Sequence, residues 1–269
     1  MELFRREVKF RLAFMDRQVS RWTGPGGIAA MLLLWQALCM TGWVSELYLP
    51  APTSILRIGW EMTASGEIAV NLQASLQRIA WGYLIGSAAG IGIGLLTGFS
   101  RVAEAVGNPL IYSLYPIPKI ALLPLIILWL GIGEVSKITI ISLGVFFPVV
   151  INTYSGVKNV EPLLLKVAVS YRTSRLSIIR KVVLPAALPV IFAGLKLAAG
   201  TSLLLLVAAE MIAAKEGIGA MILHYGDLML TTKLMVGVLV LSLLGLVFNR
   251  FLEWVERKLI PWKKAAGQS

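Results

Sequence analysis

Long apolar blocks, separated by shorter polar and basic connections, dominate the pattern along this chain. The clearest block runs from Ile79 to Phe99, which is 21 residues without an Asp, Glu, Lys or Arg. A helix of that length crosses a hydrocarbon core about 30 Å thick. Similar blocks recur, and they predict six spans at residues 28–45, 79–99, 110–130, 138–157, 190–213 and 233–251. The predicted fold class is an all-α integral membrane protein with six transmembrane helices.

The composition favours a membrane protein over a soluble domain. Of the 269 residues, 57% are hydrophobic and 14% are charged, and the mean hydropathy is +0.80. A net charge of +11 raises the alternative of nucleic-acid binding, but the cations lie between apolar blocks and do not form a basic face with stacking aromatics. Cys39 is the only cysteine, which excludes an intramolecular disulfide and a cysteine-based metal cluster.

The basic residues orient the predicted spans. The N-terminus, the 100–109 turn, the 158–189 loop and the C-terminus contain 18 Lys and Arg residues, whereas the other three connections contain five. The positive-inside rule therefore places both termini and the 158–189 loop in the cytoplasm. The resulting organisation is a basic cytoplasmic N-terminus over 1–27, a transmembrane domain over 28–252 and a cytoplasmic tail over 253–269.

The basic N-terminus and the apolar stretch behind it also fit a signal peptide. The basic region is long, however, and no small-x-small cleavage site follows it. We therefore predict a retained first span.

The external segment 46–78 contains a second signal for helix. Leu49-Pro50-Ala51-Pro52 predicts an extended lead-in, because each proline fixes its own φ and restricts the residue before it. Thr53 is a candidate cap for a short amphipathic helix that follows. We expect this helix to lie along the outer membrane interface.

Glycines repeat every fourth residue in the second predicted span, where they form a ridge for close backbone approach. The run Gly90-Ile91-Gly92-Ile93-Gly94 superficially matches a dinucleotide loop, but it lacks the preceding strand and the following acidic residue. The run from Gly131 to Lys137 approaches a P-loop, but Ser136 stands where the second glycine is required. We therefore predict a packing role for the ridge and no ATPase motor in this chain. The ridge consists of Gly82, Gly86, Gly90, Gly94 and Gly98.

The third predicted span is interrupted by prolines. Pro116, Pro118 and Pro124 remove backbone donors and free the carbonyls that those donors would have bound. Such groups are tolerated at membrane depth only where protein or a water-filled path satisfies them. The span is therefore predicted to line the interior of the assembly, and the fourth span, with Pro148 and Asn152, is a second candidate.

Two ionisable residues, Lys196 and Glu210, fall in the fifth predicted span. They are 14 residues apart, so they share one helix face to within about 40° but lie about 21 Å apart along the axis, too far to pair. Glu210 is predicted to face a polar interior. For Lys196 two alternatives remain open: its side chain faces the polar interior, or it snorkels to the end of the helix. The candidate translocation-path residues are Tyr112, Tyr115, Lys119, Asn152, Lys196 and Glu210.

The 158–189 loop is patterned as a cytoplasmic helical hairpin. Pro162 suits the first turn of one helix, and Ser174 is placed to cap a second helix that runs through Val183. The run Leu184-Pro185-Ala186-Ala187-Leu188-Pro189 is predicted to end the second helix before the membrane. The hairpin has basic and apolar faces without catalytic groups, which indicates a docking element for another protein.

These residues resemble a known family. The run Lys166-Val167-Ala168-Val169-Ser170-Tyr171-Arg172, followed by Val183 to Pro189 and Gly194-Leu195-Lys196, resembles the EAA loop of ABC importer permeases. Leu49 to Pro52, Tyr115 to Pro124, Trp129 to Glu134 and Ala208 to Met211 are similar to the nitrate/sulfonate/taurine (also bicarbonate) permease group. The resemblance covers about residues 46 to 262.

The resemblance implies a type I ABC importer permease in a bacterial plasma membrane. Two permease copies would line a path for a small oxyanion, two cytoplasmic ATPases would grip the EAA loops, and an external solute-binding protein would deliver the solute. This chain would not be an enzyme and would hold no cofactor, because ATP and Mg would bind the ATPase. The residues implied to couple to the ATPase are Lys166, Ala168, Ser170, Tyr171, Arg172, Ser174 and Arg175.

The sequence departs from the family pattern at two hairpin positions and at one position in the third span. Lys166 stands where the family has Glu, and Arg172 stands where it has Gly, so Arg172 must adopt φ > 0 or a different turn. Tyr115 stands where an Arg is common. These differences leave the docking geometry and the identity of the solute open.

A secondary transporter for a small solute is the alternative from another class. It would typically show a repeated half with discontinuous helices in matching places, and the proline-interrupted span has no such counterpart. A metal-dependent enzyme is disfavoured, because His224 is the only histidine and no cluster of metal-binding residue types accompanies it.

Overall fold

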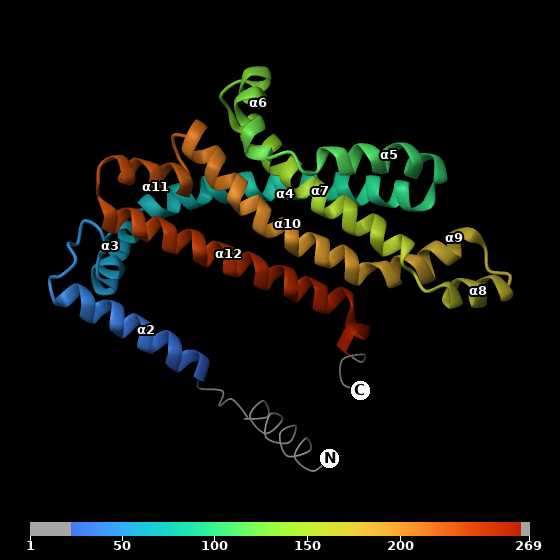
Figure 1. Cartoon of the computed structure of the whole chain (residues 1–269), viewed down its shortest axis with the longest axis horizontal. Coiled ribbons are helices and arrows are strands. Elements are labelled where there is room, and N and C mark those ends of the chain that lie inside the picture. The colour runs from blue at the N-terminus through green and yellow to red at the C-terminus, as the bar shows by residue number, and fades with distance from the viewer. Residues whose placement is uncertain (1–22, 265–269) are drawn as a thin grey trace, which may run out of the picture.

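The computed structural model describes residues 23–264, which form helices and no strands (Figure 1). The predicted N-terminal region 1–27 and the tail 253–269 therefore lie partly outside the described residues. The main helices are α2 (Thr23–Met40), α3 (Pro52–Ala64), α4 (Glu67–Phe99), α5 (Arg101–Leu114), α6 (Leu123–Leu130), α7 (Glu134–Lys158), α8 (Pro162–Ser170), α9 (Arg175–Ile178), α10 (Leu184–Ala213), α11 (Ile218–Asp227) and α12 (Thr231–Leu259). Short turns of other helix types cover Lys119–Leu122 (η1), Ile179–Val183 (η2) and Pro261–Lys264 (η3).

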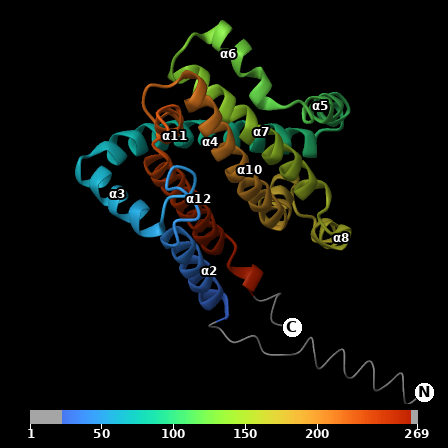
Figure 2. The same ribbon diagram turned by 60° about the vertical axis from the view of Figure 1, so that its left-hand side comes forward.

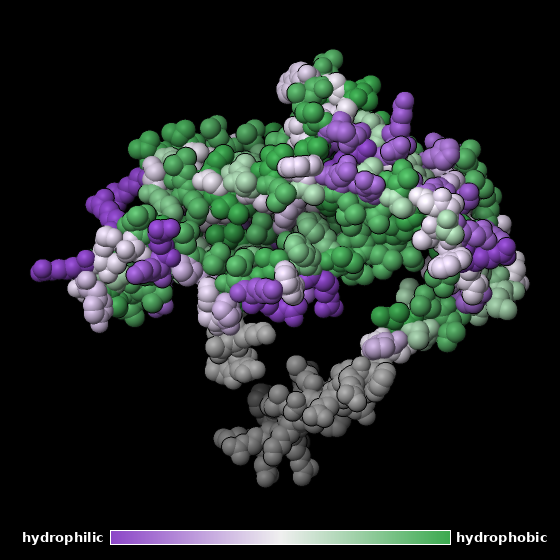
Figure 3. Space-filling model, turned by 180° about the vertical axis from the view of Figure 1, so that it is seen from behind, coloured by the Kyte–Doolittle hydropathy of each residue, from purple (hydrophilic) through white to green (hydrophobic). Residues whose placement is uncertain are grey.

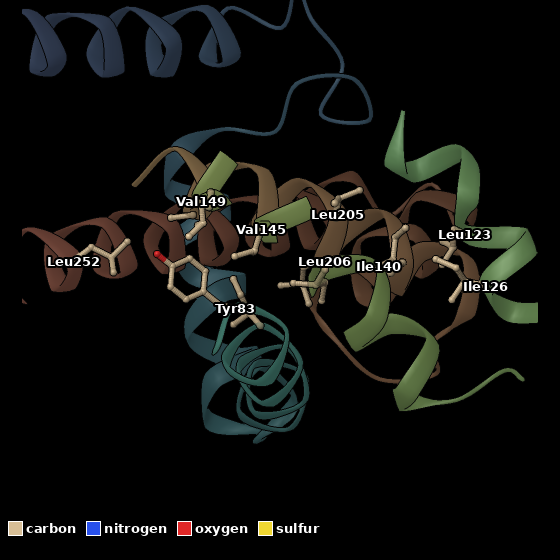
Figure 4. Packing of buried hydrophobic residues seen from close by; sticks show 14 residues of the cluster. Tyr83, Leu123, Ile126, Ile140, Val145, Val149, Leu205, Leu206 and Leu252 are labelled. Atoms are coloured by element: carbon tan, nitrogen blue, oxygen red, sulfur yellow. The ribbon is translucent and has the colours of Figure 1, made fainter. Parts of the chain in front are cut away.

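Three long helices, α4, α7 and α10, form the centre of the molecule (Figures 1 and 2). Their apolar side chains meet in one large buried cluster that also receives Leu123 and Ile126 from α6 (Figure 4). Ile141 and Val145 of α7 and Leu206 of α10 are completely or almost completely buried in it. This packing fixes the relative positions of the helices that carry the candidate path residues Asn152, Lys196 and Glu210.

The predicted glycine ridge is confirmed as the contact between α4 and α7. A Cβ atom at Gly86 would lie 2.5 Å from the carbonyl oxygen of Ser142, and one at Gly94 would lie 2.6 Å from Cβ of Thr153. Such distances are shorter than van der Waals contact, so only glycine permits the observed approach. The ridge therefore determines how closely the two central helices pack.

Each of the six predicted spans corresponds to a helix or a helix pair. Four of the described helical segments are long and apolar enough to cross a membrane, namely Glu67–Phe99, Glu134–Lys158, Arg175–Ala213 and Thr231–Leu259. The pair Arg101–Leu114 and Lys119–Leu130 passes the same criteria together, with a bend of 89° at the predicted proline break. The first predicted span corresponds to α2, which is apolar but shorter.

Several predicted boundaries were wrong. The second span begins at Glu67, not at residue 79, and the predicted 100–109 turn is helical from Arg101 onward. Only Ser100 separates α4 from α5, because its hydroxyl accepts a hydrogen bond from the Ala103 amide (3.3 Å) and so begins a new helix at once.

The helix predicted within 46–78 is confirmed as α3, but its predicted cap is wrong. Pro52 already lies in the first turn and Ala51 is the capping residue, without a side-chain hydrogen bond. The fixed φ of proline is compatible with the first helical position, so the helix begins before Thr53. Thr53 instead contacts the side-chain oxygen of Gln36 in α2 at 3.3 Å.

Helix α11 was not predicted. It lies between α10 and α12, next to α4, and its residues Ile218, Met221 and Tyr225 are buried. The residues of the connection between the fifth and sixth spans therefore pack as a helix against the membrane domain.

The surface divides along the long axis of the molecule. In Figure 3, hydrophobic side chains cover most of the middle, and hydrophilic side chains gather mainly toward the two ends. Helices α8 and α9 lie at one end, and α3 and α11 lie at the other (Figure 1). A molecule with this distribution fits a bilayer with its two polar ends in water.

Candidate functional site

The first candidate site is the hairpin between α7 and α10. Pro162 occupies the first turn of α8, as predicted, and the Ser174 hydroxyl accepts a hydrogen bond from the Ser177 amide (3.4 Å) at the start of α9, also as predicted. Helix α8 exposes apolar side chains, including Leu163 (60% exposed), Val167 (47%) and Tyr171 (81%). An exposed apolar stripe at a polar end of a membrane protein is typical of a surface that binds another protein.

The turn of the hairpin is a left-handed helix cap. Arg172 has a φ of 52°, its amide donates to the carbonyl of Val169 (2.8 Å), and the Thr173 amide donates to the carbonyl of Ala168 (3.3 Å). These two bonds are those of the motif that usually ends a helix with glycine. Of the two alternatives for Arg172, the structure shows φ > 0, so the departure from the family's glycine leaves this turn in place.

The predicted end of the second hairpin helix was wrong. The chain continues from α9 through the π turn η2 directly into α10, so Leu184 to Pro189 is helical. Pro185 lies immediately after the π turn, where the hydrogen-bond register shifts and a missing backbone donor is best tolerated. The hairpin is therefore joined to the membrane domain through one continuous rod.

The second candidate site is the break between α5 and α6. Helix α5 ends at Leu114, and Pro116 and Pro118 separate it from η1. The ammonium of Lys119 binds the carbonyl oxygens of Leu114 (3.0 Å) and Tyr115 at the break. The Leu114 carbonyl also accepts from the Ile117 amide (3.3 Å). Lys119 therefore satisfies the end of α5 with a positive charge, as helix C-termini favour.

Lys119 also forms part of the wall of a cavity of about 530 Å³. Its Nζ lies 4.2 Å from the ring centre of Phe147 and 5.4 Å from that of Tyr115. Thr201 of α10 supplies a hydroxyl, and most of the remaining lining is apolar. The cavity lies between η1, α7 and α10, and its wall contains one cation and two aromatic rings.

The other candidate path residues are distributed differently. Tyr112 is exposed on α5, and the Asn152 amide donates to the carbonyl of Pro148 (2.8 Å), whose ring lines the cavity. Lys196 forms an ion pair with Glu256 of α12, and Glu210 is completely buried. The structure therefore brings Tyr115 and Lys119 together but separates Lys196 and Glu210 from them.

Glu210 belongs to a charged cluster that the sequence analysis missed. Arg78, which was counted among the external connections, is 4% exposed and donates to Glu210 (2.8 Å) and twice to Glu134 (2.6 and 2.9 Å). Lys137 pairs with Glu134 at 2.8 Å, and Ser75 donates to Glu210 at 2.7 Å. Arg78, and not a cation of the proline-broken span, therefore pairs with Glu210.

A signal for this cluster was present in the sequence. Glu134 ends one of the family-like motifs and Glu210 lies in another, although they are far apart along the chain. Two carboxylates at the ends of apolar helices require compensating cations, and Arg78 within α4 and Lys137 in the first turn of α7 were available. Periodicity alone does not show that these four residues meet.

Comparison with known proteins identifies the family. The family described as binding-protein-dependent transport system inner membrane component matches residues 82–261. The chain belongs to this family. The match spans α4 to α12, including the hairpin and the break between α5 and α6.

Individual relatives agree with this assignment. The chain is 39% identical to a putative aliphatic sulfonates transport permease of Bacillus subtilis, with 88% of this chain and 86% of the relative covered. It is 33% identical to the taurine transport system permease of Escherichia coli (97% and 96% covered) and 32% identical to a nitrate import permease of Leptolyngbya laminosa (88% of each). These relatives are similar over nearly their whole lengths.

The fold is also that of solved ABC importers. A chain from inward-facing MetNI methionine ABC transporter aligns with a TM-score of 0.58 at 19% identity, covering 70% of this chain and 93% of that chain. A chain from an amino acid ABC transporter aligns with a TM-score of 0.57 at 17% identity. The predicted fold class, a type I ABC importer permease, is confirmed by this likeness and by the family match. The protein is a multi-pass membrane permease.

Proposed function

We propose that this chain forms the translocation path of an ATP-driven importer for a small oxyanion such as an aliphatic sulfonate, taurine or nitrate. The observation that carries the proposal is the position of Lys119, a cation at a proline-broken helix that opens onto the 530 Å³ cavity. An anion that enters a low-dielectric interior needs a compensating positive group. The similar permeases named for aliphatic sulfonates, taurine and nitrate support the same class of cargo.

Lys119 has one N–H donor that remains available for a ligand. An ammonium has three N–H donors, and two acceptors, the carbonyls of Leu114 and Tyr115, are already bound. One donor is left for an oxyanion, and Tyr115 and Thr201 line the same cavity. The single cation surrounded by apolar side chains favours an anion with a low charge.

The hairpin supports coupling to a separate ATPase. Its exposed apolar stripe on α8 lies at the end of the molecule that the positive-inside rule assigns to the cytoplasm. The rod formed by α9, η2 and α10 leads from the turn that joins α8 to α9 to Thr201 at the cavity. A movement of α9 would therefore be transmitted to the cavity wall without an intervening loop.

The assembly that follows contains two copies of this chain, cytoplasmic ABC ATPase subunits that bind ATP and Mg, and an external solute-binding protein. The complex would lie in a bacterial plasma membrane with both termini of this chain in the cytoplasm. A helical hairpin that docks a motor is not a feature of a secondary transporter, which needs no such partner.

The test is substrate-dependent ATP hydrolysis by the reconstituted complex with its solute-binding protein. Ethanesulfonate, taurine and nitrate are supplied in turn, with glucose, an uncharged solute, as the control. Stimulation of hydrolysis and of uptake by one of the three oxyanion-bearing solutes supports the proposal. Stimulation by glucose alone contradicts the cargo class, and uptake without any ATPase contradicts the transport mechanism.

A further inference from the structure

We infer that Glu134 occupies an oxyanion-binding site formed by Arg78 and Lys137, and that an incoming oxyanion binds these cations when Glu134 moves away. The site lies where α7 begins and α10 ends, beside Arg78 about three turns into α4, at the end of α7 and α10 away from the hairpin. The cavity at Lys119 involves none of these three residues, so this is a second and separate anion site.

The contacts of Glu134 are those of a bound oxyanion. Nε and Nη2 of Arg78 donate to its two carboxylate oxygens at 2.6 and 2.9 Å, and Nζ of Lys137 lies 2.8 Å from one of them. A guanidinium fork that binds two oxygens at once, with a third cationic donor, matches carboxylate, sulfonate and nitrate equally well. The chain's own carboxylate thus shows what the site recognises.

Burial differs sharply between the site and its occupant. The side chains of Arg78 and Lys137 are each 5% exposed, whereas the side chain of Glu134 is 57% exposed. The cations are therefore held by the protein, and the carboxylate approaches them from the surface. A change of side-chain rotamer at Glu134 exposes the two cations without a change in the helices.

Other contacts keep the cations in place when Glu134 leaves. Nη1 of Arg78 donates to the buried carboxylate of Glu210 (2.8 Å) and to the carbonyl of Glu216 (2.6 Å). Nζ of Lys137 also reaches the carbonyl of Ala213 (3.3 Å). The site is thus preorganised from the side opposite to Glu134.

The charge balance defines the ligand. With Glu134 away, Arg78 and Lys137 carry two positive charges against the single negative charge of Glu210. One monovalent oxyanion restores neutrality. The first turn of α7, where Glu134 lies, adds a favourable field for negative charge but is secondary to the two cations.

Competition from Glu134 would keep the site weak. A tethered carboxylate competes at an effective concentration in the millimolar range or above, so a free anion binds weakly and is released when Glu134 returns. Such a site suits first contact with the cargo and not storage of it. This role rests on the proposed oxyanion transport, whereas binding itself is measurable without transport.

The experiment uses the detergent-purified permease–ATPase complex and ethanesulfonate as the probe, with chloride keeping the ionic strength constant. The thermal unfolding midpoint is followed as the probe is titrated into wild type, Glu134→Ala, and Glu134→Ala combined with Lys137→Met. Glu61→Ala is the matched control, because Glu61 is an exposed carboxylate paired with an exposed arginine, Arg57. We expect a saturable rise in the midpoint for Glu134→Ala at a concentration at least about tenfold lower than for wild type.

We expect the combined variant to lose that response and Glu61→Ala to behave like wild type. A folded Glu134→Ala complex without a saturable response, or an equal response in Glu61→Ala or in the combined variant, overturns the site. If Glu134→Ala does not fold, Glu134→Gln keeps the side-chain shape without the charge, and a folded Glu134→Gln complex without a response tighter than that of wild type overturns the site as well.

Uptake by the wild-type complex separates this inference from the proposed function. Anion binding to Glu134→Ala with no oxyanion uptake by wild type retains the site and removes its transport role. Oxyanion uptake with no binding to Glu134→Ala retains the proposed function and removes the site.

Discussion

Arg78 of α4 and Glu210 of α10 form an ion pair inside the membrane domain, with 2.8 Å between Nη1 and Oε1. Arg78 is 4% exposed and Glu210 is completely buried. Glu210 also accepts hydrogen bonds from Ser75 (2.7 Å) and from the amide of Gly219 (2.8 Å) at the start of α11. The pair therefore joins two of the three central helices and the turn that follows α10.

Removal of Arg78 alone should destabilise the permease strongly. Arg78→Met leaves the Glu210 charge buried without a partner, which costs about 3–5 kcal/mol in comparable buried pairs. We expect a lower unfolding midpoint and a reduced yield of folded complex, with partial recovery when Glu210→Gln is added. Arg57→Met removes an exposed cation and serves as the control. An Arg78→Met protein as stable as Arg57→Met would contradict a structural role for the pair.

The glycine ridge should tolerate no larger side chain on the face toward α7. Gly90→Leu places atoms where Cβ alone would already lie 2.9 Å from Val149, so the two central helices must separate. We expect loss of folded complex in size-exclusion chromatography and not a change in substrate preference. Gly92→Leu is the matched control, because nothing lies within 4 Å of a Cβ at Gly92. Equal recovery of the two variants would show that the ridge is not a packing surface.

Replacement of Arg172 by glycine should relieve the backbone strain in the left-handed turn of the hairpin. Arg172→Gly removes the strain of φ 52° and should stabilise the turn by about 1 kcal/mol, since a left-handed conformation costs other residues 1–2 kcal/mol. Slower hydrogen exchange of the amides of Arg172 and Thr173, which close the cap, is the measurement. Arg172→Val, with a branched side chain, should have the opposite effect. Faster exchange in Arg172→Gly would indicate that the arginine side chain itself holds the turn.

A charge in the hairpin's apolar stripe should weaken ATPase docking. Ala168→Asp introduces a carboxylate beside Leu164 and Val167 on α8 without changing the membrane domain. We expect loss of ATPase co-purification and of uptake, while the permease still inserts. Deletion of 166–174 should have the same result. Glu161→Asp, a conservative change at the end of the same helix, is the control, and unchanged ATPase association in Ala168→Asp would remove the docking assignment.

Loss of the Lys119 charge should reduce transport more than assembly. Lys119→Met removes the cation from the cavity wall, so anion-stimulated uptake should fall about tenfold or more, in line with loss of an interaction of about 1.4 kcal/mol or more. Basal ATPase activity and complex recovery should stay near wild type, and Lys119→Arg should retain part of the uptake. Lys215→Met removes an exposed cation from the turn after α10 and is the control. Failure of assembly in Lys119→Met would show that capping of α5 is the main role of this residue.

The local structure of the hairpin and of the proline break could be predicted from the sequence, because each feature depends on residues that are close in sequence. Pro162 and Ser174 act on their own helix ends, and the effect of Pro116 and Pro118 on the third span is confined to one turn. The boundaries near residue 79 and over 100–109 were wrong because helices continue past the apolar block when their polar residues find partners. Arg78 is such a residue, since it is buried within α4 only with the help of Glu134 and Glu210.

The sequence by itself determined the membrane class, the helical architecture, the glycine contact surface and the family. The reason is that the length of the apolar blocks, the spacing of residues and the order of motifs are all features of the linear chain. Tertiary structure alone decided which charges meet. Lys196 binds Glu256 and Glu210 binds Arg78, although the spacing along the chain favoured neither pair. The physical reason is that a buried charge selects its partner by distance across packed helices, and that distance is fixed only when α4, α7 and α10 close on one another.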